Sequence, residues 1–203
     1  MEKGIDVLGL SCSPRKDGNT ALMLDAVLAG AESAGALVEK IHVPSLDIKP
    51  CKACNACFER GRCIQQDDMQ ILYPRLLGWE IIILAAPIFS MNLAAQAKIL
   101  IDRLQCLWAT KFVLHRHTTD ESIRGKRRGL WLSAAGHPRE TVFEPPLVTV
   151  RYFFDMLEIG NWNQVTINRL DEKGAVRTVP GALERCREQG IAAVNRYKEH
   201  SRQ

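Results

Sequence analysis

Short apolar runs alternate with longer segments of helical spacing along the chain. The clearest run covers residues 80–85, where β-branched side chains follow one another as in a strand buried on both faces. Such runs, and the turn-forming residues between them, predict strands at residues 5–11, 37–43, 80–85, 129–134 and 163–167. Apolar positions three and four apart predict helices at residues 20–34, 67–76, 93–107, 145–157 and 180–199.

This alternation predicts an α/β fold. Repeated strand–helix units indicate a parallel sheet with helices on both faces. Five strands in a chain of 203 residues fit the flavodoxin-like three-layer sandwich, with strand order 2-1-3-4-5. We expect residues 1–203 to form a single domain, with a cysteine-rich loop at residues 50–64. Ligands of such sheets bind beyond the carboxyl ends of the strands, which points to residues 12–19, 86–92 and 135–138.

Composition narrows the class of protein. With 46% hydrophobic residues, 25% charged residues and a net charge of +4, the chain is neither disordered, collagen-like nor a coiled coil. The longest apolar run, residues 81–89, is less than half of the roughly 20 residues that a membrane span needs. The start of the chain lacks the pattern of a signal peptide, so we expect a cytoplasmic protein that binds no membrane. The seven cysteines are then expected to be reduced, metal-bound or reactive rather than paired.

The segment after the first predicted strand has the chemistry of a phosphate cradle. Phosphate at a helix N-terminus needs free backbone N–H groups, small polar donors and a cation. The loop offers hydroxyls, an amide, a positive charge and a glycine for the turn, from Ser11, Ser13, Thr20, Asn19, Arg15 and Gly18. It matches neither a P-loop nor the Rossmann glycine pattern. The alternative is an ordinary strand–helix turn capped by Asn19.

The segment after the third predicted strand is apolar and suits a flat ring. Pro87, Ile88, Phe89 and Met91 supply the surface, and the turn amides around Ser90 and Asn92 supply donors at its edge. The alternative is a core strand that runs directly into the next helix.

These segments together resemble the NADPH-dependent FMN reductase and iron–sulfur flavoprotein group, over roughly residues 4–160. The matching pieces are residues 9–15, 18–20, 87–90, 95–98, 100–104 and 151–154. The resemblance implies that Ser11, Ser13, Arg15, Asn19 and Thr20 hold the phosphate of FMN. It also implies that residues 87–92 hold the isoalloxazine ring, which Ala135, Gly136 and His137 approach from the loop after the fourth strand.

Four cysteines are spaced C-x₂-C-x₂-C-x₅-C, at Cys51, Cys54, Cys57 and Cys63. Closely spaced sets of four thiolates that begin C-x₂-C-x₂-C are typical of 4Fe–4S clusters. Structural zinc usually uses two C-x₂-C pairs across a longer spacer, and free thiols without a metal are the third interpretation. We favour the cluster.

The leading hypothesis is an FMN-dependent oxidoreductase that couples its flavin to the cluster, with NAD(P)H as a possible electron donor. No catalytic acid, base or nucleophile is expected. One alternative is a cluster-free NAD(P)H-dependent FMN or quinone reductase, and another is a non-catalytic redox carrier or sensor.

The expected partner is a small molecule or a redox protein such as ferredoxin, which the basic segment at residues 111–128 would attract. No nucleic acid is expected, because no nucleic-acid module accompanies this segment. The resemblance implies a homodimer or a dimer of dimers.

Overall fold

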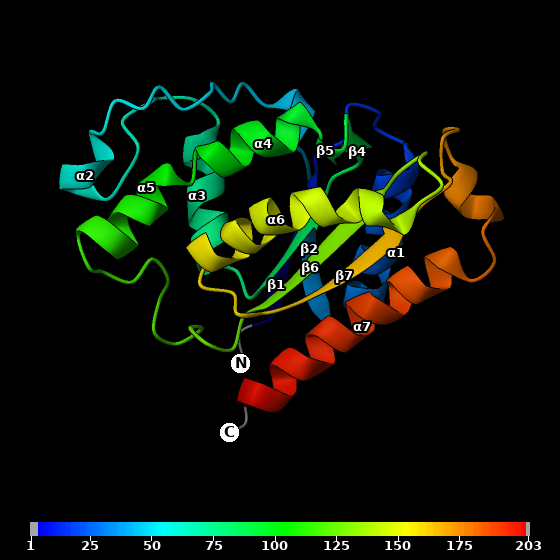
Figure 1. The fold of residues 1–203 in the computed structure, drawn as a ribbon. Coiled ribbons are helices and arrows are strands. Elements are labelled where there is room, and N and C mark those ends of the chain that lie inside the picture. The colour runs from blue at the N-terminus through cyan, green and yellow to red at the C-terminus, as the bar shows by residue number, and fades with distance from the viewer. Residues whose placement is uncertain (1–3, 202–203) are drawn as a thin grey trace.

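The computed structural model describes residues 4–201, and its centre is a five-stranded parallel sheet (Figure 1). The strands are β1 (Ile5–Ser11), β2 (Ala36–His42), β3 (Ile81–Ala85), β6 (Arg128–Ala134) and β7 (Asn161–Ile167). They lie in the order β2-β1-β3-β6-β7, and each neighbouring pair is parallel. The predicted fold and strand order are therefore confirmed.

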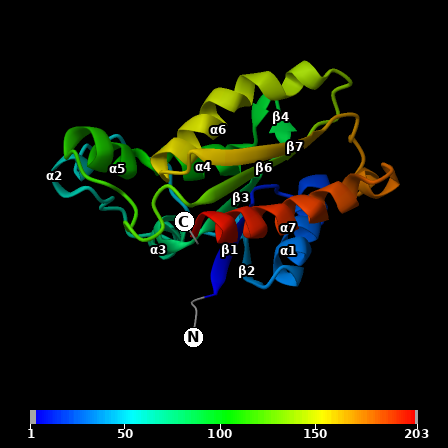
Figure 2. The ribbon, with the colours of Figure 1, turned by 90° about the horizontal axis from the view of Figure 1, so that it is seen from below.

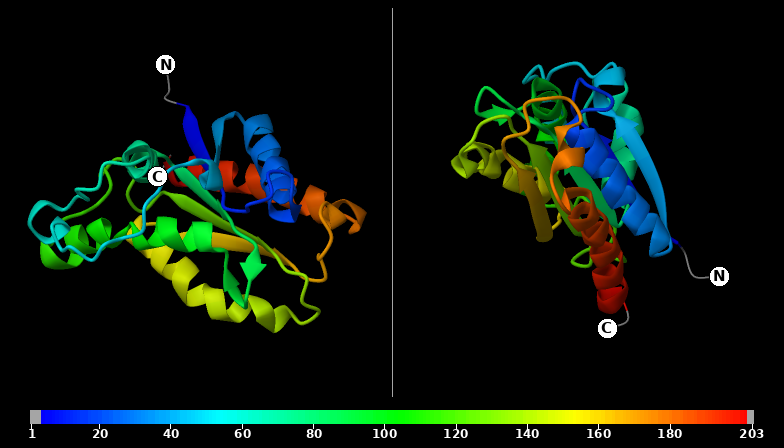
Figure 3. Two further views of the ribbon diagram at one scale, coloured as in Figure 1. Left: turned by 90° about the horizontal axis from the view of Figure 1, so that it is seen from above. Right: turned by 90° about the vertical axis from the view of Figure 1, so that its right-hand side faces the viewer.

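Helices cover both faces of the sheet. On one face, α1 (Asn19–Ser33) packs against α7 (Ala182–Ser201), as Figures 1 and 2 show. On the other face lie α3 (Met69–Gly78), α4 (Ala95–Asp102) and α6 (Glu144–Met156), and Figure 3 shows the sheet between the two layers. None of the helices within residues 4–201 combines the length and the apolar character that a transmembrane span requires.

Each face of the sheet has its own hydrophobic core, because successive side chains of a strand point to opposite sides. Toward α3, α4 and α6 the sheet contributes Leu8, Leu10, Ile82, Leu84 and Trp131. Toward α1 and α7 it contributes Val7, Ile81, Ile83, Leu130 and Leu132. All of β3 is buried, which explains why its sequence shows no alternation between apolar and polar residues.

Two regions differ from the prediction. The segment after β3 forms a small hairpin, β4 (Ile88–Phe89) and β5 (Asn92–Leu93), whose two turn residues have positive φ. The predicted helix at residues 93–107 is divided into α4 and α5 (Gln105–Trp108). At the break, the carbonyl oxygen of Arg103 accepts a hydrogen bond from the Tyr73 hydroxyl (2.8 Å). A side chain of α3 thus provides a hydrogen bond to this carbonyl at the point where α4 ends.

Candidate functional site

The three loops singled out in the sequence meet at one pocket. The register places the ends of β1, β3, β6 and β7 at the same edge of the sheet. A pocket of about 620 Å³ opens beyond this edge. It is lined by Ser13, Arg15, Gly18, Asn19, Thr20, Pro87, Ile88, Phe89, Ala134, Gly136, Leu170 and Asp171. The structure thus brings together residues from the loops after β1, β3 and β6, the three regions in which the sequence predicted ligand binding.

The start of α1 offers this pocket backbone donors. The N–H of Leu22 donates to the carbonyl of Gly18 (3.0 Å), so the N–H groups of Asn19, Thr20 and Ala21 stand at the open end of the helix. The first turn of α1 carries no acidic residue. The partial positive charge of the helix N-terminus is therefore available to an anion.

The side chain of Asn19 makes three hydrogen bonds within the protein. Its Nδ2 donates to the carbonyls of Leu170 (3.2 Å) and Glu172 (2.9 Å), while its Oδ1 accepts from the N–H of Val176 (3.1 Å). Both amide hydrogens are therefore already donated within the protein. Asn19 joins the start of α1 to the segment after β7, and what it can offer an anion is its backbone N–H.

Six of the predicted cofactor-binding residues do not line the pocket: Ser11, Ser90, Met91, Asn92, Ala135 and His137. Ser11 is fully buried, and its Oγ has no hydrogen-bond partner in the structure. The ring of His137 turns back on its own loop, where Nδ1 accepts from the N–H of Arg139 (3.0 Å). Ala135 is held in the backbone ladder, because its N–H donates to Ile167 and its carbonyl accepts from Leu170.

The hairpin beside the pocket presents apolar side chains. Ser90 and Met91 form its turn with φ values of 48° and 65°, a conformation that most side chains disfavour. Phe89 is 48% exposed and Met91 is 49% exposed, although both are large and apolar. Strained turns of this kind occur often at ligand sites, and the exposed pair suits a ring bound next to the hairpin.

The segment after β7 contributes Leu170 and Asp171, which the sequence prediction missed. A Cβ atom at Gly136 would lie 2.7 Å from Oδ1 of Asp171, so a larger residue there would displace the Asp171 side chain in the pocket wall. Their position after the last predicted strand could have indicated them, because β7 ends at the same edge of the sheet as β6.

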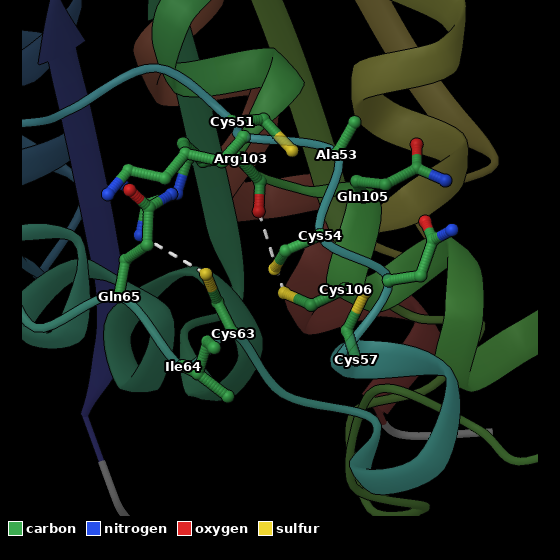
Figure 4. Close-up of a pocket in the computed structure, with 12 residues that line it drawn as sticks. Cys51, Ala53, Cys54, Cys57, Cys63, Ile64, Gln65, Arg103, Gln105 and Cys106 are labelled. Atoms are coloured by element: carbon green, nitrogen blue, oxygen red, sulfur yellow. Dashed lines mark hydrogen bonds between the residues drawn. The ribbon is translucent and has the colours of Figure 1, made fainter.

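The four cysteines of the predicted cluster line a second pocket, of about 370 Å³ (Figure 4). Cys51 and Cys54 are exposed, whereas Cys57 and Cys63 are half-buried. Cys106 of α5, which the sequence prediction treated as an ordinary core residue, lines the same pocket. Within residues 4–201, no three side chains of His, Cys, Asp or Glu form a group that could hold one metal ion.

The backbone of the cysteine loop is tightly coiled. Ala53, Asn55 and Gly61 have left-handed φ values of 50°, 57° and 68°. The short helix α2 (Cys57–Arg60) ends at Gly61, whose carbonyl accepts from the Thr110 hydroxyl (2.8 Å). The loop is thereby fastened to the segment that follows α5.

Cys57, the third cysteine of the motif, favours its neutral form in the protein alone. Burial raises the pKa of Cys57, and the neighbouring thiol groups of Cys63, Cys51 and Cys54 raise it further. A positively charged metal centre would reverse this effect, because metal coordination deprotonates a thiol. The four thiols that line this pocket are ligands of the type that iron–sulfur clusters use.

Comparison with known proteins agrees with this geometry. The family model for NADPH-dependent FMN reductase matches residues 5–138. An iron–sulfur flavoprotein of Archaeoglobus fulgidus is 42% identical over 102 residues, which are 50% of this chain and 45% of that protein. Another, from Methanosarcina thermophila, is 34% identical over 61% of this chain and 65% of its own length. The matched segment thus spans about half to two thirds of these two relatives.

A further iron–sulfur flavoprotein, from Methanocaldococcus jannaschii, is 30% identical over 76% of this chain and 74% of that protein. Among solved structures, the NAD(P)H:quinone oxidoreductase of Methanothermobacter marburgensis has the same fold, with a TM-score of 0.70. Its sequence is 16% identical, and the match covers 93% of this chain and 96% of that one. From the family match over residues 5–138 and from these relatives, the chain belongs to the NADPH-dependent FMN reductase family and is similar to its iron–sulfur flavoproteins.

Proposed function

We propose that this protein is an FMN-dependent oxidoreductase that couples its flavin to a 4Fe–4S cluster held by Cys51, Cys54, Cys57 and Cys63. The observation that carries this proposal is the presence of two separate pockets with matching chemistry. One lies beyond the sheet at the open N-terminus of α1, and the other is lined by the four thiols. When bound, FMN would supply hydride transfer and single-electron transfer, and the cluster would supply single-electron transfer.

The residues of the first pocket divide by chemistry. Ser13, Thr20 and the backbone N–H groups at the start of α1 would bind the phosphate, with Arg15 supplying a positive charge. Pro87, Ile88 and Phe89 form the apolar side of the pocket and would orient the ring. None of these residues needs to donate or accept a proton, so the chain contributes binding and orientation.

The cluster is favoured over zinc by the spacing of the cysteines. A single zinc ion needs its ligands to converge on one point, at about 2.3 Å for sulfur. Structural zinc usually uses two C-x₂-C pairs across a longer spacer, whereas these four cysteines are spaced C-x₂-C-x₂-C-x₅-C. A four-iron cluster is larger than one ion and uses Cys₄ ligation, which suits thiols spread around a pocket.

Iron and acid-labile sulfide per FMN, measured on protein purified without oxygen, test the proposal. We expect about four irons per FMN in the wild type. In Cys57→Ala we expect the iron to be lost and FMN to be retained, because Cys57 lines only the thiol pocket. Cys186→Ala is the matched control, since this cysteine is buried away from both pockets and its loss should leave the iron content unchanged.

The two alternative functions give different results in the same preparation. Bound FMN without iron in the wild type would contradict the cluster and favour a reductase that uses NAD(P)H and a quinone or free flavin. Bound iron and FMN with no consumption of NAD(P)H, whatever the acceptor, would favour a redox carrier or sensor.

The phosphate cradle is tested by Arg15→Met. Arg15 is exposed and lines the pocket, so its removal should weaken FMN binding about tenfold, the effect of one charge-assisted hydrogen bond. Titration of the apoprotein, followed by quenching of flavin fluorescence, measures this change. Lys16→Met, at an exposed neighbour that does not line the pocket, should bind FMN as the wild type does. Equal affinities in all three proteins would contradict the assignment.

The expected redox partner and the homodimer stay predictions. A surface for an electron-transfer protein would lie beside the thiol pocket, where Phe58, Trp108 and Phe112 form a row of rings with centroids 5.9 and 5.7 Å apart. Phe112 is 52% exposed, and the neighbouring Lys111 would favour an acidic partner.

A further inference from the structure

Arg103, directly after α4, has its guanidinium buried at the wall of the thiol pocket (Figure 4). Its side chain is completely inaccessible to solvent, as is that of its ion-pair partner Asp67. Nη2 donates to the Sγ of Cys63 (3.4 Å) and to Oδ1 of Asp67 (3.1 Å). Nη1 donates to the other oxygen of Asp67 and to the carbonyl of Lys49 (2.8 Å).

The same ion pair joins the two ends of the cysteine loop. Lys49 precedes the first cysteine, and its N–H donates to Oδ2 of Asp67 (3.0 Å), which lies beyond the last cysteine. Asp67 also accepts from the N–H of Met69 (3.1 Å), at the start of α3. Burial acts to raise the pKa of Asp67, but the hydrogen bonds from Arg103 and Lys49 outweigh it and lower the pKa, so the carboxylate stays charged.

We infer that Arg103 is a positioning residue for the metal–sulfur group, closing the cysteine loop through Asp67 and donating a hydrogen bond to the Cys63 thiolate. This inference rests on the proposed function. Among the four loop cysteines, Cys63 is the one whose sulfur accepts this bond. A planar fork with five N–H groups can serve a sulfur, a carboxylate and a carbonyl together, which a lysine ammonium cannot do in the same geometry.

The hydrogen bond has an electronic consequence. Hydrogen bonds to the ligand sulfurs and local charge are main determinants of cluster reduction potential. A donor and a positive charge beside Cys63 stabilise the more negative, reduced state, and therefore raise the potential. The negative charge of Asp67 acts in the opposite direction.

A pair of variants separates this effect from simple loosening of the loop. Arg103→Gln removes the positive charge and should make the cluster potential more negative. Asp67→Asn removes the negative charge with little change of shape and should make the potential more positive. We expect each to change the equilibrium constant for reduction about tenfold, which is about 59 mV for one electron. The measurement is a redox titration followed by electron paramagnetic resonance on the anaerobically purified protein.

Arg127→Gln is the matched control. Arg127 is also buried, and its guanidinium donates to the carbonyls of Trp79 (2.9 Å), Leu157 (2.5 Å) and Leu76 (2.6 Å), away from the thiol pocket. Its loss should lower stability and leave the potential unchanged.

Opposite shifts in the two variants, with no shift in Arg127→Gln, would support the inference. Shifts of the same sign, or no shift in proteins that retain the cluster, would overturn it and leave the proposed function intact. If Arg103→Gln does not fold, Asp67→Asn decides alone, since an unchanged or lowered potential contradicts the inference. A wild type without iron would overturn the inference and the proposed cluster together.

Discussion

Replacing Gly190 by alanine is expected to destabilise the protein by about 3 kcal/mol, although alanine is the better helix former. At this position α7 crosses α1, and a Cβ atom would lie 2.0 Å from the carbonyl oxygen of Val27. The other helix has the same kind of contact at the crossing, since a Cβ at Gly30 of α1 would lie 2.0 Å from the carbonyl oxygen of Arg187 in α7. Both contacts are with backbone, so no side chain can rotate away and the two helices must separate.

The size of the effect follows from two opposing contributions. Alanine gains about 1 kcal/mol in helix propensity over glycine. Overpacking costs about 1–3 kcal/mol where side chains can adjust, and more where backbone is displaced. For a protein of this length the loss lowers the melting temperature by about 2–4 °C per kcal/mol. Thermal unfolding of the FMN-free protein measures it.

Gly78→Ala is the control for this prediction. Gly78 ends α3, and nothing lies within 4 Å of a Cβ atom built there, so its replacement should be neutral. The variant with alanine at both Gly30 and Gly190 should lose less than the sum of the two single losses, because one separation of the helices relieves both contacts. A Gly190→Ala protein as stable as the wild type would show that the crossing is not tight.

The sequence predicted the elements that hydrophobic periodicity determines. The buried run at residues 80–85 and the helix expected at residues 20–34 are confirmed, and Gly35, just beyond that helix, has a left-handed φ of 89°. Strand order followed from the alternation of strands and helices, because right-handed crossovers leave few arrangements of a parallel sheet.

Contacts between distant segments could not be predicted in this way. The hairpin at residues 88–93 has Ser-Met in its turn, whereas a pair such as Asn-Gly would have predicted a hairpin from the sequence. Arg103 and Cys106 line the thiol pocket although they lie some 40 positions beyond the last cysteine of the motif, and no local sequence pattern links them to it. The sequence placed Asn19 in the loop after the first strand, but it could not predict the side-chain partners, which lie some 150 positions further along the chain.

This role of Asn19 leads to the second large effect. Asn19→Ala is expected to destabilise the FMN-free protein by about 2–3 kcal/mol, because three hydrogen bonds to Leu170, Glu172 and Val176 are lost. We expect FMN binding to weaken at least tenfold as well, since the released segment carries Leu170 and Asp171 of the pocket wall. The measurements are urea unfolding of the apoprotein and titration with FMN.

The stability of the apoprotein distinguishes this role from direct binding of phosphate. A side chain that only contacts phosphate would weaken FMN binding when removed and leave the FMN-free protein as stable as before. Thr20→Val supplies that contrast, because Thr20 lines the same pocket and valine keeps its shape while removing the hydroxyl. We therefore expect both variants to bind FMN weakly and Asn19→Ala alone to unfold at lower urea. Equal unfolding midpoints for Asn19→Ala and the wild type would contradict the structural role and favour Asn19 as a phosphate ligand. The segment after β7 would then be held by other contacts, such as the ion pair of Lys173 with Asp17 (2.8 Å).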